Sequence, residues 1–310
     1  MRNLSSTRSG QKRRGPDFRK NWRKHLMMVP VLVILSVFSY VPMVGIVMAF
    51  QDYIPSMGFF GSPWAGTKWF DFMFSMKDFK QVVWNTLLLS VLKLSTSLIC
   101  SVVLALMLNE VQVRWLRSGL QSMILFPFFV SWVVLADIVK DMASGEGIIN
   151  QAIFTLTGTT VPFLIDPKWF IVLLVISNIW KEAGYNAVIL MASLAAIEPA
   201  LYEAATIDGA NRFQKMIYVT LPGIRQMVMV LLILSLGGVL SAGFDQVYNL
   251  YNSTVMSGAD IIDTYVYRMG VSGGLYSLGT AVGLFKSVVG AILLVTAYRA
   301  ADKWAGYRIF

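Results

Sequence analysis

The chain alternates between long apolar runs and short polar segments. Six runs of about membrane length carry few charged residues, and they cover residues 26–50, 84–108, 119–139, 169–196, 227–244 and 280–298. An α-helix needs about 20 apolar residues to cross the hydrocarbon core of a bilayer. The pattern therefore predicts an all-α membrane protein with six transmembrane helices.

One polar island, residues 197–224, separates the fourth and fifth runs and predicts two short helices. Pro199 suits the first turn of a helix, where its missing N–H costs little. Gly209 can adopt the left-handed conformation that ends a helix, and Asn211 can cap the next one. We interpret the island as a docking element at the membrane surface. An ordinary amphipathic interfacial helix is the alternative.

The second helix of the island has one apolar face. Its members follow at i, i+3, i+4 and i+7, and they are Phe213, Met216, Ile217 and Thr220. Leu221-Pro222 is predicted to end the island.

Charge sets the predicted orientation. Of the 26 Lys and Arg residues, 17 lie in the predicted inner segments 1–25, 109–118, 197–226 and 299–310, whereas six lie in the longer outer segments between the other runs. Cytoplasmic segments carry the excess of cations, so both termini and the island are predicted to be cytoplasmic. The domain plan is a basic tail (1–25), a six-span domain (26–299) and a second tail (300–310).

Composition excludes several kinds of site. The one cysteine, Cys100, lies inside an apolar run, which excludes a disulfide framework and a cysteine-based metal site. One histidine excludes an H-E-x-x-H zinc motif, and no P-loop or G-x-S-x-G motif occurs. The net charge of +9 is explained by membrane lipid rather than nucleic acid. We predict no catalytic residues, no metal site and no enzyme activity.

The island contains a family pattern. Glu203-Ala204-Ala205, three residues, Gly209, nine residues, then Val219, one residue and Leu221-Pro222 match EAA-x3-G-x9-I-x-LP, with valine where isoleucine is usual. In this respect the chain resembles the membrane subunits of binding-protein-dependent ABC importers. Four further stretches resemble the branch that carries oligosaccharides and polysaccharide fragments, namely 41–53, 179–197, 205–213 and 283–290.

The resemblance implies a complete machine in a bacterial cytoplasmic (inner) membrane. Each permease subunit is a six-helix, type I bundle, and a second permease subunit, here predicted to be a related chain, pairs with it. Two ATPase subunits bind ATP and Mg, and an extracytoplasmic solute-binding protein delivers the saccharide. This chain itself is expected to hold no cofactor.

The resemblance also assigns the island a role as the coupling segment. Its short helices are expected to enter a cleft of the ATPase and to transmit ATP-driven closure. The residues predicted to make this contact are Glu203, Ala204, Ala205, Asp208, Gly209, Arg212, Phe213, Leu221 and Pro222. A helix face seated in a groove, with charged residues at the rim, is a common docking mode.

Five charged residues lie inside the apolar runs, where charges are costly and often functional. They are Lys93, Asp137, Lys181, Glu182 and Lys286. At about 1.5 Å per residue, the three lysines and Asp137 are placed in the outer third of a hydrocarbon core about 30 Å thick. One interpretation is snorkelling with local ion pairs. The other is a polar vestibule whose lysines favour a saccharide bearing carboxylates.

Other polar residues extend the candidate substrate path. Asn178, Glu182 and Asn186 share the fourth run with Lys181. Tyr248 and Asn249 follow the fifth run, where they could contact sugar or belong to an interfacial aromatic belt. The small residues of the fifth run are predicted to mark close helix packing, and they are Ser235, Gly237, Gly238, Ser241, Ala242 and Gly243.

These observations predict the permease subunit of an ATP-driven oligosaccharide importer. The alternative is a stand-alone secondary carrier or channel driven by an ion gradient. Dependence of transport on a separate ATPase distinguishes the two.

Overall fold

The structure is a computed structural model that describes residues 22–305. The predicted basic tail as far as residue 21, and residues 306–310 of the other tail, lie outside the described residues. The elements are α1 (Trp22–Leu35), η1 (Ser36–Tyr40), η2 (Val41–Phe50), α2 (Gly58–Gly61), α3 (Lys68–Ser75), α4 (Lys77–Glu110), α5 (Arg114–Phe129), α6 (Trp132–Ala143), α7 (Ile148–Thr157), α8 (Pro167–Ala195), α9 (Pro199–Ile207), α10 (Arg212–Lys215), η3 (Met216–Thr220), α11 (Leu221–Leu236), α12 (Phe244–Leu250), α13 (Met256–Ala259), α14 (Ile262–Tyr265), η4 (Val266–Ser272) and α15 (Tyr276–Ala305). Helices therefore dominate the described part of the chain, as predicted.

The chain forms two compact units, which are described separately. The first extends to Val47, and its described part consists of α1, η1 and the start of η2. Both candidate sites lie in the second unit, which begins at Met48.

Within residues 22–305, four helical stretches are long and apolar enough to cross a membrane, namely His25–Phe50, Lys77–Glu110, Arg212–Leu236 and Tyr276–Arg299. Two further pairs of helices pass the same test together, but each pair is bent. Arg114–Phe129 meets Trp132–Thr157 at 103°, and Pro167–Ala195 meets Pro199–Ile207 at 71°. Counting each bent pair as one span gives six, in agreement with the predicted number.

The core of the second unit is built on α4 and α8. These helices make the most extensive contact in the described chain, and α5 and α11 also pack on α8. A β-carbon added to Gly184 of α8 would overlap the carbonyl oxygen of Ile124 on α5. Glycine at this position therefore permits the close approach of the two helices.

The third predicted span is broken. We predicted one helix over 119–139 with a kink at Pro127, but α5 ends at Phe129 and α6 continues in another direction. Ser131 explains the break, because its hydroxyl accepts a hydrogen bond from Val134 N–H and caps a new helix. Asp137 consequently lies on α6, paired with Lys140 at 3.6 Å, and not on a continuation of α5.

The fifth span in the structure has different ends from those predicted. The helix begins at Arg212 and continues without interruption to Leu236, so the second short helix of the island and the fifth span form one helix rather than two. Pro222 lies in the first turn of α11, directly after the π-helical turn η3. A π turn changes the pairing of backbone groups and accommodates the missing N–H of proline.

At its other end this span stops earlier than predicted. We expected helix to residue 244, but α11 ends at Leu236, and residues 237–243 form a break before α12. The small residues predicted to mark helix packing mostly form this break. Ala242 and Gly243 have φ angles of +46° and +81°, a left-handed conformation that continuous helix does not allow.

Candidate functional site

The coupling segment (197–224) contains two helices separated by a turn, as predicted. Pro199 occupies the first turn of α9, and Gly209 has a φ angle of +78°. Asn211 and Gln214 form a capping box at α10, in which each side chain accepts a hydrogen bond from the other residue's backbone N–H, at 2.9 and 2.8 Å. Local sequence is therefore sufficient to explain this reversal.

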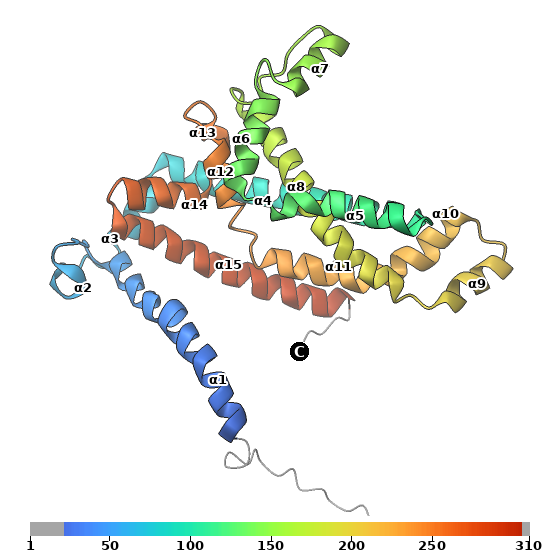
Figure 1. Cartoon of the computed structure of the whole chain (residues 1–310). Helices are drawn as coiled ribbons and strands as arrows, with labels where there is room; N and C mark the ends of the chain where they lie inside the picture. The colour runs from blue at the N-terminus through green and yellow to red at the C-terminus, as the bar shows by residue number, and fades with distance from the viewer. Residues whose placement is uncertain (1–21, 306–310) are drawn as a thin grey trace, which may run out of the picture. The chain divides into compact units, whose positions relative to one another are not determined.

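Side-chain contacts hold the two arms of the coupling segment together. The Tyr202 hydroxyl lies 3.0 Å from Thr220 Oγ1, and Lys215 Nζ donates to Thr206 Oγ1 at 2.7 Å. Figure 1 shows α9 and α10 at one end of the long helices, away from α3 and α14. The segment is thus a structured projection.

Most residues predicted to dock are accessible. Those exposed are Glu203, Ala204, Asp208, Gly209, Arg212, Phe213 and Pro222, while Ala205 and Leu221 are half-buried. Phe213 is 65% exposed, whereas Thr220, which was predicted to share its face, is 4% exposed. Within residues 22–305, Glu203, Asp208 and Arg212 form no ion pair. The segment therefore presents an apolar side chain and three available charges.

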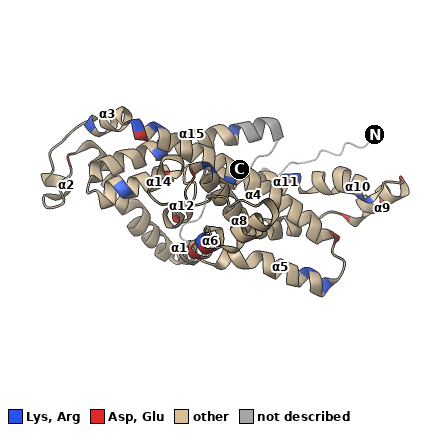
Figure 2. Cartoon of the chain, turned by 90° about the horizontal axis from the view of Figure 1, so that it is seen from above, with Lys and Arg blue, Asp and Glu red and all other residues tan. Residues whose placement is uncertain are grey.

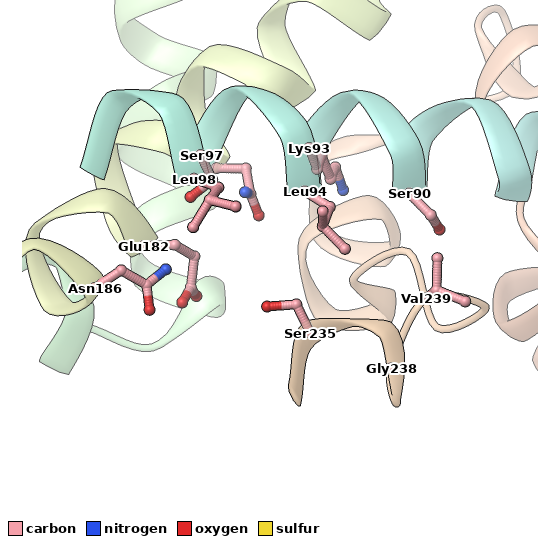
Figure 3. Close-up of a pocket in the computed structure, with 11 residues that line it drawn as sticks. Ser90, Lys93, Leu94, Ser97, Leu98, Glu182, Asn186, Ser235, Gly238 and Val239 are labelled. Carbon is pink, nitrogen blue, oxygen red and sulfur yellow. The ribbon is translucent and has the colours of Figure 1, made fainter. Parts of the chain in front are cut away.

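A polar cavity of about 170 Å³ lies between α4, α8 and the break after α11. We call it the central cavity. Figure 3 shows its lining residues. From α4 they are Ser90, Lys93, Leu94, Ser97 and Leu98, from α8 Asn178, Glu182 and Asn186, and from the third wall Ser235, Gly238 and Val239. Most of the helical ribbon in Figure 2 is neither Lys or Arg nor Asp or Glu.

Lys93 is the buried cation of the central cavity. Its side chain projects from the middle of α4 and is 5% exposed. Its Nζ donates a hydrogen bond to the Ala242 carbonyl at 2.6 Å, and no carboxylate of the described residues lies within 4.0 Å. An ammonium has three donors, so this group retains the capacity to bind a further acceptor.

Two serines on α4 accompany Lys93. Ser90 and Ser97 are 5% and 6% exposed, and their hydroxyl oxygens have no hydrogen-bond partner among the described residues. Buried polar groups are normally paired, so such exceptions call for a physical explanation. Unpaired hydroxyls beside an under-used ammonium are suited to a polar molecule that enters the cavity.

The predicted substrate-path residues fall into separate places. Lys93, Asn178, Glu182 and Asn186 line the central cavity together. Lys286 lies in a different cavity, where it pairs with Asp263 at 2.6 Å and contacts Ser241 Oγ at 3.3 Å.

Lys181 does not line the central cavity and lies instead at the end of α5. Its Nζ donates to the carbonyl oxygens of Pro127, Phe128 and Val130 at the end of α5. It also lies over the Phe128 and Trp132 rings, 5.7 and 5.6 Å from their centroids. A cation is favourable at the C-terminal end of a helix, where carbonyls lack helical partners.

Tyr248 and Asn249 lie on α12 and do not line the central cavity. Tyr248 stacks on Phe244 with centroids 5.3 Å apart, and a side-chain hydrogen bond with Tyr267 raises its pKa above the ordinary value. Asn249 donates to the Asp245 carbonyl at 2.7 Å. Tyr248 therefore belongs to a separate aromatic cluster, and Asn249 bonds to the backbone of its own helix.

Sequence reasoning missed Ser90, Ser97 and Ser235 of the central cavity. A usable signal was present on α4, because Ser90 and Ser97 lie three residues before and four residues after Lys93. These spacings place all three on one helix face. Ser235 was mentioned only as a packing residue.

Comparison with known proteins identifies the family. The family described as "binding-protein-dependent transport system inner membrane component" matches residues 97–306. The chain belongs to this family. It is a membrane-spanning permease subunit of the ABC importer class, and such subunits are not themselves catalytic.

Two individual relatives support this family membership. The chain is 44% identical to Protein LplB of Bacillus subtilis (strain 168) over 281 residues, covering 90% of this chain and 88% of the relative. It is 41% identical to the polygalacturonan/rhamnogalacturonan transport system permease protein YteP of the same organism over 287 residues, covering 92% and 89%.

A solved structure extends this agreement to the fold. A chain from the crystal structure of a bacterial ABC transporter involved in the import of the acidic polysaccharide alginate superposes with a TM-score of 0.85 at 35% identity. The match covers 93% of this chain and 98% of that one. The type I importer permease fold predicted from sequence is confirmed.

Proposed function

We propose that this chain is the permease subunit of an ATP-driven importer of acidic oligosaccharides or polysaccharide fragments. The observation that carries the cargo assignment is the central cavity, where Lys93 has one hydrogen-bond acceptor and no carboxylate partner among the described residues. Named relatives move polygalacturonan or rhamnogalacturonan and alginate, which supports a uronate-bearing cargo.

The cavity suits such a molecule chemically. A carboxylate can accept charge-assisted hydrogen bonds from Lys93 while sugar hydroxyls pair with Ser90 and Ser97. Asn178 and Asn186 supply amide donors and acceptors on the opposite helix. Glu182 can accept hydrogen bonds from ring hydroxyls.

The energy is proposed to come from a partner. Phe213 and the charged residues around it are exposed on a structured hairpin, which suits insertion into a cleft of an ATPase subunit. ATP and Mg would be held by the two ATPase subunits. A second permease subunit completes the path, and a solute-binding protein delivers cargo from outside. Both termini and the coupling segment face the cytoplasm of a bacterial inner-membrane protein.

The coupling role is tested with Gly209→Val in proteoliposomes that contain the complete complex. A side chain at positive φ costs about 1–2 kcal/mol, so the reversal should distort and ATP-driven uptake should fall about tenfold or more. Gly158→Val is the matched control, because Gly158 also has positive φ (+74°) and open space around it but lies outside the coupling segment. Equal losses in both variants, or wild-type uptake driven by an ion gradient without the ATPase, contradict the coupling role.

The cargo class is tested with Lys93→Met, which retains a long side chain and removes the charge. Uptake of a uronate oligomer should fall about tenfold or more, as expected when a charge-assisted hydrogen bond is lost. Uptake of a neutral oligomer of equal length should change less. Lys80→Met, at an exposed position on the same helix, serves as the control. Equal losses for acidic and neutral cargo would show that Lys93 does not recognise the carboxylate.

A further inference from the structure

A second polar cavity, of about 220 Å³, lies near the beginning of α4. We call it the outer cavity, because the proposed topology places this end of α4 outside the membrane. Its polar lining consists of Asp78, Gln81 and Asn85 from α4, with Ser257, Asp260 and Arg268 from the segment between α12 and α15. None of these residues lines the central cavity.

Hydrogen bonds between distant segments build the wall of the outer cavity. Asn85 is 2% exposed, and its Nδ2 donates to the carbonyl oxygens of Ser257 and Asp260 at 3.1 and 3.2 Å. Gln81 Nε2 then donates to Asn85 Oδ1 at 2.9 Å. This chain of amides fixes one wall and leaves the Gln81 carbonyl oxygen as an acceptor.

Arg268 provides donors on the facing wall. Its guanidinium forms an ion pair with Asp260, whose other carboxylate oxygen accepts from Thr264 Oγ1 at 2.7 Å. The buried Arg268 Nε has no partner among the described residues. Arginine carries five N–H donors in a rigid plane, so the ion pair with Asp260 leaves some of them unused.

The charges indicate which groups the outer cavity can bind. Asp78, Asp260 and Arg268 sum to a charge of −1, which favours contact with the hydroxyl groups of a sugar unit over contact with its carboxylate. Hydroxyl groups both donate and accept, so adjacent hydroxyls of a sugar ring match carboxylate and amide acceptors beside guanidinium donors. The outer cavity therefore differs from the central cavity, which presents an under-used ammonium.

Both cavities lie along α4. Gln81 precedes Lys93 by 12 residues, which corresponds to about 18 Å along the helix. Thr86 and Leu89 lie between them and are each 0% exposed. Thr86 Oγ1 also accepts a hydrogen bond from Ile262 N–H at 2.9 Å, so packed side chains separate the two cavities in this conformation.

We propose that the outer cavity is a second saccharide subsite, which binds the ring hydroxyls of a sugar unit farther back along the same oligomer than the unit in the central cavity. This inference rests on the proposed function, because it assumes that a saccharide passes along α4. It predicts that longer cargo gains affinity from the outer cavity, whereas cargo too short to reach both cavities does not.

The experiment measures uptake kinetics by the reconstituted complex for uronate oligomers of increasing length, with Gln81→Ala and Asp78→Asn. Loss of about one hydrogen bond should raise KM roughly fivefold to tenfold for long oligomers, with little change for the shortest one. Gln151→Ala is the control, since Gln151 is an exposed glutamine that bonds only to a backbone carbonyl among the described residues.

Several results would overturn the subsite. The first is that Gln81→Ala and Asp78→Asn give the same KM as Gln151→Ala at every oligomer length. The second is that uptake by these two variants falls equally at every length and their thermal stability is reduced. Weaker binding of the cargo-free solute-binding protein would assign the cavity to a protein interface. Failure of the proposed function is distinguishable, because it would appear as absent ATP-driven uptake in the unaltered complex.

Discussion

Two buried lysines in this molecule have contrasting surroundings. Lys181 donates to three carbonyl oxygens and lies over two aromatic rings at the end of α5. Lys93 donates to one carbonyl oxygen and borders a cavity. Both are 5–7% exposed, so burial does not separate them. The number of satisfied donors does separate them, and it agrees with a structural role for Lys181 and with the cargo-binding role proposed for Lys93.

The largest effect expected from this comparison concerns stability. Lys181→Met removes the cation at the end of α5, so the carbonyl oxygens of Phe128 and Val130 lose their hydrogen bonds from its ammonium. The complex should lose about 3 kcal/mol of stability, measured as a lower melting temperature in detergent. Lys93→Met should change stability by less than about 1 kcal/mol, because it removes a buried charge that has no counterion. Similar losses in the two variants would abolish the distinction.

A smaller effect, with stability and transport moving in opposite directions, is expected at the serines of the central cavity. Ser90→Ala and Ser97→Ala each remove a buried hydroxyl that has no partner among the described residues. Stability should stay constant or rise by up to about 1 kcal/mol, while the KM for uronate cargo rises a fewfold. Ser101→Ala is the matched control on α4, because the Ser101 hydroxyl donates to the Ser97 carbonyl at 2.6 Å. A fall in stability without a change in KM would indicate a packing role for Ser90 and Ser97.

The coupling segment could be predicted from sequence because its determinants are local. Proline in a first turn, glycine with positive φ and a capping asparagine each act within a few residues. The structure has them at Pro199, Gly209 and Asn211. Hydropathy likewise predicted six spans, because a membrane imposes a minimum apolar length on each helix.

The roles of the lysines could not be predicted in this way. Helical rise gave similar depths for Lys93, Lys181 and Lys286, but depth along an axis does not say which neighbour a side chain meets. Lys181 meets the end of α5, more than 50 positions earlier in the chain, and Lys93 meets Ala242, 149 positions later. Such partners depend on tertiary packing.

The breaks at Ser131 and residues 237–243 were missed for a related reason. Hydropathy does not report a change of direction within an apolar run, and both runs remain apolar across the break. Ser131 acts as a helix cap inside the third run, and small residues were interpreted as packing contacts.

The uninterrupted helical stretch from Arg212 to Leu236 has a mechanical consequence. Its 25 residues form a rod about 37 Å long, with the coupling segment at one end and a wall of the central cavity at the other. A tilt of about 10° would displace the far end of such a rod by about 6 Å. The rod stops at the non-helical break, beyond which α12 packs on α6. A push received at the proposed ATPase contact would therefore reach the cavity wall along one continuous helix, and the break would separate that movement from α12.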